Sequence, residues 1–301
     1  MKKLLFFVLI TTSFTIGCTK QDAIKDKLTD ASKQMNVAKP TTSYVPVDFT
    51  LLDIGALHNK HVITLLDNTQ GLPQVDDIIA NGRIFFTGID FMPIESTNGG
   101  IFQRALITSN ELAHVGYDFR NLPHPNVSAN VKLYINNLLT ALDNSNTFSE
   151  MLAAIDVIDN DAQTNLTDAD LDIIKGTCII ARYSAALWSP VSEGGLGYYD
   201  KAMQFSPVMR GGGGPGRFVI GDVSASAQYF TGLGIAASLG LGVPGANAAI
   251  LGGWAISAGL GSLCTLVGAD TVPAPDQPED IKYDPVKKTL VFEVTPYKLV
   301  F

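Results

Sequence analysis

The chain is short of charge, and over one long stretch it has none. Charged residues make up 17% of the 301 residues, and not one lies between Asp222 and Asp270. Hydrophobic residues reach 46%, a composition that excludes an intrinsically disordered protein. The formal net charge is -8 with no basic stripe to offset it, which argues against a nucleic-acid partner.

Cysteine is scarce, and the common catalytic motifs are missing. The chain has Cys18, Cys178 and Cys264 but no C-x-x-C pair, and no serine lies in a G-x-S-x-G turn. Hydrolytic or redox catalysis therefore has no positive support, and the sequence implies no cofactor. We expect Cys178 and Cys264 to be unpaired buried thiols, with a disulfide between them as the alternative in an oxidising compartment.

The first residues have the layout of a bacterial secretory signal. Lys2 and Lys3 precede an uninterrupted apolar run over residues 4–10, and the stretch ends at Gly17 and Cys18. The run is shorter than the about 20 residues that a bilayer span requires. A cleaved signal is therefore favoured over a membrane-spanning anchor.

The end of this signal is similar to a lipobox, in which the cysteine after the cleavage site is lipidated. Thr15 stands where leucine is usual, and an ordinary signal peptide with Cys18 as a bystander is the alternative. We predict a lipoprotein signal peptide over residues 1–17 and a lipid-attached tether over 18–46, with acylated Cys18 (palmitate) binding membrane lipid. Thr19 after the cysteine favours the cell outer membrane within the cell envelope.

Hydrophobic periodicity from residue 47 to 192 predicts a helical bundle domain. Asp53 and Asn126 are the expected N-caps of two helices, and Thr147 with Glu150 matches a capping box. Further helices are expected over residues 101–115 and from Thr167 onward.

Glycine then interrupts the helical pattern over residues 193–217, which we predict to be a Gly-rich linker. The glycine run at 211–216 is followed by Arg217 and Phe218, where a phosphate-binding loop needs Lys and then Ser or Thr. A nucleotide site is therefore not expected.

Residues 218–270 read as two apolar helices of about 20 residues each, the length of a bilayer span. A Gly-Val-Pro-Gly sequence at 242–245 divides them. Small residues recur at every fourth position, a spacing that lets another backbone approach closely; they are Gly232, Ala236, Gly240, Gly245, Ala249, Gly253, Ser257 and Gly261. We predict a glycine-zipper helical hairpin that spans a membrane, is buried in the domain, or undergoes conditional insertion or self-association. Burial or packing on other copies in the resting state is favoured over constitutive spanning.

The last segment, residues 271–301, is expected to be a short β tail. Strands are predicted near 281–283 and 289–294 on either side of an Asp-Pro turn, with a third over 297–301. The predicted fold class is therefore mainly α, with a helical bundle, a glycine-zipper helical hairpin and a short C-terminal β-hairpin.

Two histidines are weak candidates for metal ligands. His58 and His61 are spaced i, i+3, and His114 and Asp118 could complete a site if the fold brings them near. The pattern lacks the i, i+4 spacing and the glutamate of zinc peptidases. His61 also lies on an apolar stripe, so a buried core histidine is preferred and no metal is predicted. The acidic residues over 159–170 lack the glycine and final glutamate of a calcium loop.

The sequence Gly55-Ala56-Leu57-His58-Asn59, followed later by the small-residue segment, resembles a group of uncharacterised Gram-negative bacterial lipoproteins. Those proteins carry a helical Gly-x-Leu-His-Asn domain and a C-terminal glycine-zipper segment, and the resemblance covers residues 50–270. It implies a role for His58 and Asn59 but brings no established activity.

Three functional hypotheses follow. The leading one is a lipid-anchored cell-envelope protein without evident catalysis, whose hairpin mediates membrane association or self-assembly. The second is a secreted toxin-like protein that permeabilises membranes with a releasable hydrophobic hairpin. The third is a metal-dependent enzyme that uses His58 and His61.

Overall fold

Helices form most of the part of the chain that the structure describes. This computed structural model describes residues 49–87, 120, 128–205, 214–240, 246–267, 281–284 and 289–292. All of them belong to one unit, residues 42–301, and the contacts discussed below lie within it. The predicted mainly α class is confirmed.

The helical elements lie along the chain in an order that leaves the two most apolar helices last. They are η1 (Leu51–Asp53), α2 (Ile54–Asn68), α3 (Val75–Thr87), α5 (Ala129–Asp143), α6 (Phe148–Asn165), α7 (Asp168–Trp188), η3 (Val191–Glu193), α8 (Tyr198–Phe205), α9 (Gly216–Gly240) and α10 (Ala246–Val267).

The capping box predicted at the start of α6 is confirmed. The hydroxyl of Thr147 accepts a hydrogen bond from the Glu150 N–H at 3.2 Å, and the Glu150 carboxylate accepts one from the Thr147 N–H at 3.1 Å. Glu193 of η3 accepts a further bond from the N–H of Phe148 at 2.7 Å. The first N–H groups of α6 are thus satisfied partly by a segment that follows α7.

Of two other predicted helix starts, one needs correction and one is confirmed in its position. The helix assigned to Asn126 begins only at Ala129, because Ser128 is its N-cap and accepts the N–H of Val131 at 3.1 Å. Asp53 is the N-cap residue of α2 as predicted, but its carboxylate accepts a bond from the Thr50 N–H at 2.9 Å and makes no capping bond to α2. Asparagine and serine both offered plausible caps for α5, and the hydrogen bond from the Val131 N–H identifies Ser128 as the cap.

The prediction of a linker over residues 193–217 is wrong in part, because α8 (Tyr198–Phe205) forms within it. Ala202 is buried on this helix, while Tyr198 and Lys201 bind the carboxylate of Asp67 on α2. The glycines on both sides of α8 favoured the prediction of a linker. A helix of eight residues is too short to be stable alone, and contacts with α2 stabilise it.

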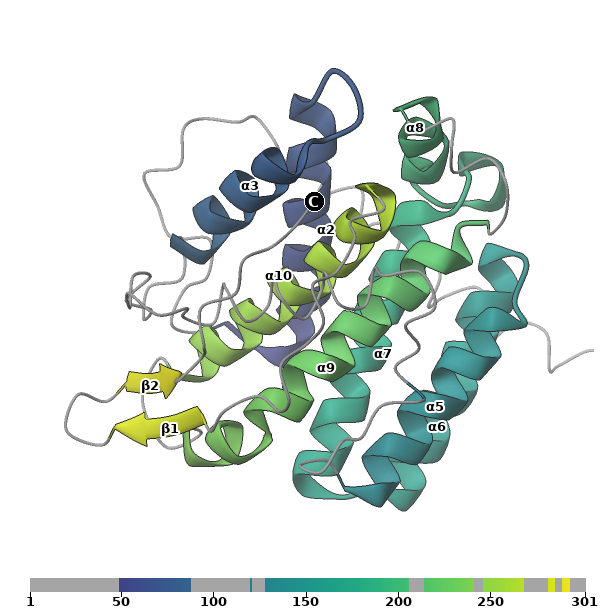
Figure 1. The fold of residues 1–301 in the computed structure, drawn as a ribbon. Helices are drawn as coiled ribbons and strands as arrows, with labels where there is room; N and C mark the ends of the chain where they lie inside the picture. Colours follow the sequence, from purple (N-terminus) through teal and green to yellow (C-terminus); the bar gives the residue numbers. More distant parts are fainter. Residues whose placement is uncertain are drawn as a thin grey trace, which may run out of the picture. The chain divides into compact units, whose positions relative to one another are not determined.

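The helices of the predicted bundle and of the predicted hairpin pack against one another. Figure 1 shows α9 and α10 side by side, with α7 along α9 and α2 along α10, and α10 also contacts α3. Within the described residues, Ile250–Val267 is the segment long and apolar enough to cross a membrane, and 89% of it is buried inside the protein. Its apolar surface is therefore covered by neighbouring helices.

The α9 and α10 backbones meet where both helices carry glycine. A Cβ atom built on Gly261 would lie 2.5 Å from the carbonyl oxygen of Gly221 and 2.7 Å from Cβ of Ala225. A Cβ atom on Gly221 would lie 2.9 Å from the Thr265 hydroxyl. The two helices can approach this closely only because neither glycine has a side chain.

Gly261 is one of the predicted small-residue positions and takes part in this contact. Gly221 and Ala225 also take part but were not predicted. Gly253, Ser257 and Gly261 are buried in α10. Gly232, Ala236 and Gly240 fall within α9, and Ala249 falls within α10, whereas Gly245 lies outside the described residues.

Two short strands follow the helices. β1 (Ile281–Asp284) pairs antiparallel with β2 (Thr289–Phe292), with Ile281 opposite Phe292 and Asp284 opposite Thr289. The expected third strand, the signal peptide with Cys18, the tether, and the helix over 101–115 with His114 lie outside the described residues.

Candidate functional site

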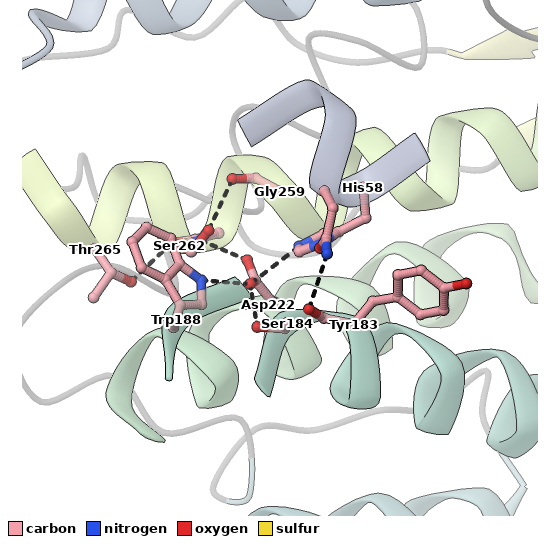
Figure 2. Close-up of polar contacts among 10 residues, drawn as sticks. His58, Tyr183, Ser184, Trp188, Asp222, Gly259, Ser262 and Thr265 are labelled. Atoms are coloured by element: carbon pink, nitrogen blue, oxygen red, sulfur yellow. Dashed lines mark hydrogen bonds and ion pairs between the residues drawn. The ribbon is translucent and has the colours of Figure 1, made fainter. Parts of the chain in front are cut away.

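A buried carboxylate lies at the centre of the helical domain. Asp222 of α9 has no exposed surface, and its Oδ2 accepts hydrogen bonds from the Ser184 hydroxyl at 2.6 Å and the Trp188 ring N–H at 3.3 Å. Its Oδ1 accepts the backbone N–H of Ser262 at 3.0 Å, and Nε2 of His58 lies 3.0 Å from Oδ2 (Figure 2). A carboxylate is stable in such a place only when it is fully paired, and here α2, α7 and α10 supply the partners.

The surroundings of His58, the partner of this carboxylate, favour its protonated form. The amide nitrogen of Asn59 donates to the backbone oxygen of Tyr183 at 3.1 Å, so the amide oxygen of Asn59 faces Nδ1 of His58 at 2.8 Å. Nδ1 therefore carries a proton, while Nε2 points at Asp222. Burial lowers the pKa of His58, but the charge of Asp222 and hydrogen bonds with Asp222 and Asn59 outweigh it and raise the pKa above 6.5.

The Gly-x-Leu-His-Asn sequence owes its residue types to this packing. A Cβ atom on Gly55 would lie 2.3 Å from the ring of Tyr183, so glycine is needed where α7 crosses α2. Leu57 is buried, and His58 and Asn59 bind Asp222 and Tyr183 as described. The sequence motif therefore has a structural role in joining α2 to α7 and α9.

His61, one helical turn after His58, has a different environment. It is fully buried, its ring lies 5.1 Å from that of Phe85 at a tilt of 58°, and a Cβ atom on Gly259 would lie 2.6 Å from its Nδ1. Within the described part of the chain neither ring nitrogen has a hydrogen-bond partner. Burial first, and the charge of His58 second, lower the pKa of His61 to about 3, so its ring is neutral.

The histidines do not form a metal site with other described residues. No group of three His, Cys, Asp or Glu side chains suited to a metal occurs among the residues that the structure describes. His58 is occupied by Asp222 and Asn59, and His114 and Asp118 lie outside those residues. The hypothesis of a metal-dependent enzyme thus gains no support from the positions of His58 and His61.

The acidic residues over 159–170 also have protein partners. Arg182 of α7 binds Asp156 at 2.8 Å and Asp159 at 2.6 Å, and the Tyr134 hydroxyl donates to Asp161. Asp170 accepts a bond from the Ser128 hydroxyl at 2.8 Å. These contacts join α5, α6 and α7.

Cys178 and Cys264 are both free and buried, so no disulfide joins them. Burial raises the pKa of each thiol to about 12. Neither thiol is therefore a reactive nucleophile at neutral pH.

The residues around Asp222 include the side-chain types of a hydrolase triad but not its arrangement. In a triad the histidine lies between serine and carboxylate and removes the serine proton. Here Asp222 lies between Ser184 and His58, and all three are inaccessible to solvent. The arrangement cannot activate Ser184, but it can hold three helices together by one charge.

Sequence reasoning did not pair His58 with Asp222. The available signal was the position of Asp222 at the edge of a long charge-free segment, since a carboxylate buried with that segment needs a cationic partner. Searches of family models, curated proteins and solved structures find no match to this chain.

Proposed function

We propose that this chain is a lipid-anchored protein of the cell envelope, without evident catalysis, that keeps an apolar helical hairpin in its core. The hairpin consists of α9 and α10, and it mediates membrane association or self-assembly. The basic and apolar start that ends at Cys18 supports the anchor, as does the resemblance to lipoproteins with a Gly-x-Leu-His-Asn domain.

One observation carries the role of the hairpin. Ile250–Val267 combines the length and composition of a membrane span with 89% burial inside the domain. The charged cluster around Asp222 is closed to solvent, so it supports the packing of α9 and α10 and not a reaction with a substrate.

The anchor is tested by fractionating native cells that express the wild-type chain or Cys18→Ala and extracting the membranes with alkaline carbonate. Wild-type protein should stay in the membrane pellet and Cys18→Ala should become soluble, because α10 is covered by other helices. A Cys18→Ala protein that stays in the pellet would show that the hairpin itself is inserted.

Self-assembly is tested by enlarging the small residues of the hairpin. Gly240→Leu and Gly253→Leu should lower the oligomer mass measured by light scattering. The matched control is Gly71→Leu, since a Cβ atom at Gly71 meets nothing within 4 Å. Helicity by circular dichroism must be unchanged for the comparison to count. An unchanged mass would exclude assembly through these residues.

A second function is membrane permeabilisation by a released hairpin, and the burial of the apolar helix α10 inside the domain favours it. It contacts α2, α3 and α9 and is largely covered by them, as an element held for later exposure would be. Dye release from liposomes of mixed anionic and zwitterionic phospholipid tests this directly. Absence of leakage from about pH 4 to 8, where carboxylates and histidines titrate, would rule it out.

A further inference from the structure

The two histidines of α2 bind the two helices of the hairpin in opposite ways. Nε2 of His58 contacts the carboxylate of Asp222 on α9, whereas the ring of His61 lies against Phe85 of α3 and Gly259 of α10. Both side chains are completely buried. The same helix thus places one histidine against a carboxylate on α9 and another against α10, where no carboxylate is among its described contacts.

We propose that the packing of α2 on α10 is an acid-sensitive latch, in which protonation of His61 requires α2 and α3 to separate from α10. Acid then uncovers the apolar surface of α10. Acidification would thus be the signal that exposes the hairpin. The use of the exposed hairpin rests on the proposed function, whereas the separation of the helices in acid does not.

Among the described residues, a cationic His61 has no hydrogen-bond acceptor in its packed position. Phe85 presents an aromatic ring, Gly259 presents a backbone without a side chain, and neither ring nitrogen of His61 is hydrogen bonded within the described residues. An imidazole in water takes up its proton near pH 6.5. Because the pKa of His61 is lowered in the packed state, the stability that its neutral form contributes is present above about pH 6.5 and is lost as the pH falls toward 3.

The charged group that acts on His61 is His58, and it opposes protonation. Residues Ala246–Val267 of α10 include no acidic or basic side chain, and their ionisable group is Cys264. On α7, Arg182 is paired with Asp156 and Asp159 of α6. The other titratable residues of η1, α2, α3 and α7 are Asp53, Lys60, Asp67, Asp76, Asp77, Arg83, Asp168, Asp170, Asp172, Lys175, Cys178 and Tyr183.

Hydrogen exchange of the full chain in a mild detergent tests the latch without a membrane. Exchange is followed by mass spectrometry at pH 7, 6 and 4.5, corrected for the intrinsic pH dependence of amide exchange, on peptides from α2 and α10. Peptides from α5 and α6 serve as the internal reference. For one proton taken up per opening, the opening constant of α2 and α10 should rise about 25-fold between pH 6 and 4.5.

The variant His61→Leu should lose this rise while keeping its protection at pH 7, because the ring makes no hydrogen bond that leucine would remove. The control Lys60→Gln, one position away on the exposed side of α2, should retain the wild-type response. A rise in His61→Leu equal to that of wild type would overturn the proposal.

Should His61→Leu fail to fold, histidine imidazole resonances of the wild-type chain provide the test. The His61 resonance should keep the chemical shift of a neutral ring until the amides of α10 lose their protection. A His61 resonance that titrates near pH 6.5 while α10 stays protected would overturn the latch. The exchange experiment contains no vesicles and is therefore independent of the dye-release test. If α10 opens in acid but liposomes release no dye, permeabilisation is rejected and the latch is retained.

Discussion

Nε2 of His58 lies 3.0 Å from Oδ2 of Asp222, and neither side chain has any exposed surface. Such a pair is costly to bury, but removing one member is costlier, since the remaining charge loses its partner and cannot reach water. Three further donors on Asp222, from Ser184, Trp188 and Ser262, compensate its loss of hydration.

Replacing Asp222 by asparagine should therefore lower the free energy of unfolding by about 3–5 kcal/mol. The side chain keeps its shape, but His58 loses the opposite charge. Urea denaturation followed by circular dichroism measures the change. The same substitution at Asp143, which binds Arg120 at the surface, should cost less than about 1 kcal/mol. Equal effects at the two positions would contradict the role assigned to Asp222.

His58 should make stability depend on pH in the neutral and alkaline range. Its folded-state pKa is raised, so its contribution is fully present below about pH 6.5 and is lost as the pH rises through the folded-state value. The stability difference between wild type and His58→Gln should shrink with rising pH, by up to about 1.4 kcal/mol per pH unit. Urea titrations from pH 6 to 9 measure it, and a constant difference would show that His58 is not protonated.

Gly261→Ala should destabilise the chain although alanine is the better helix former. The propensity gain is about 1 kcal/mol, but the new methyl group would lie 2.5 Å from the Gly221 carbonyl oxygen, and such overpacking costs about 1–3 kcal/mol or more. Thermal unfolding compares it with Gly71→Ala, where a Cβ atom meets nothing. A melting temperature at or above that of wild type would mean that α9 and α10 separate easily at Gly221.

The two buried cysteines should resist alkylation in the native chain. Burial raises their pKa to about 12, so almost no thiolate is present at pH 8. Mass spectrometry after iodoacetamide treatment should show Cys178 and Cys264 unmodified without urea and fully modified in it. Rapid labelling of Cys264 alone under native conditions would reveal that α10 opens.

The helices were predictable where periodicity and caps agree along the chain. The helix expected from Thr167 onward, which is α7, and the Thr147–Glu150 capping box rest on local features, and residue types alone predicted both. The start of α5 was misplaced because Asn126 and Ser128 are both good N-caps. The helix α8 was missed because its stability comes from contacts with α2, which no local pattern contains.

The site was harder to foresee, since its contacts join residues far apart in sequence. Fourfold spacing of small residues indicated close packing in α10, and Gly261 does contact α9. The partner residues Gly221 and Ala225 precede Gly232, the first residue of the predicted small-residue spacing. That spacing therefore did not indicate them. The environments of His58 and His61 differ because α9 offers Asp222 where α10 offers Gly259.

The donors to Asp222 also bear on the order in which the chain folds. His58 and Ser184 precede it, but Ser262, in the last long helix, supplies the N–H to Oδ1. A chain growing from its N-terminus therefore cannot complete the core until nearly all of α10 has emerged, and its most distant contacts form last and slowly. Until then the apolar segments lack the helices that cover them, and a chain cut short before residue 262 lacks the backbone donor to Oδ1 of Asp222.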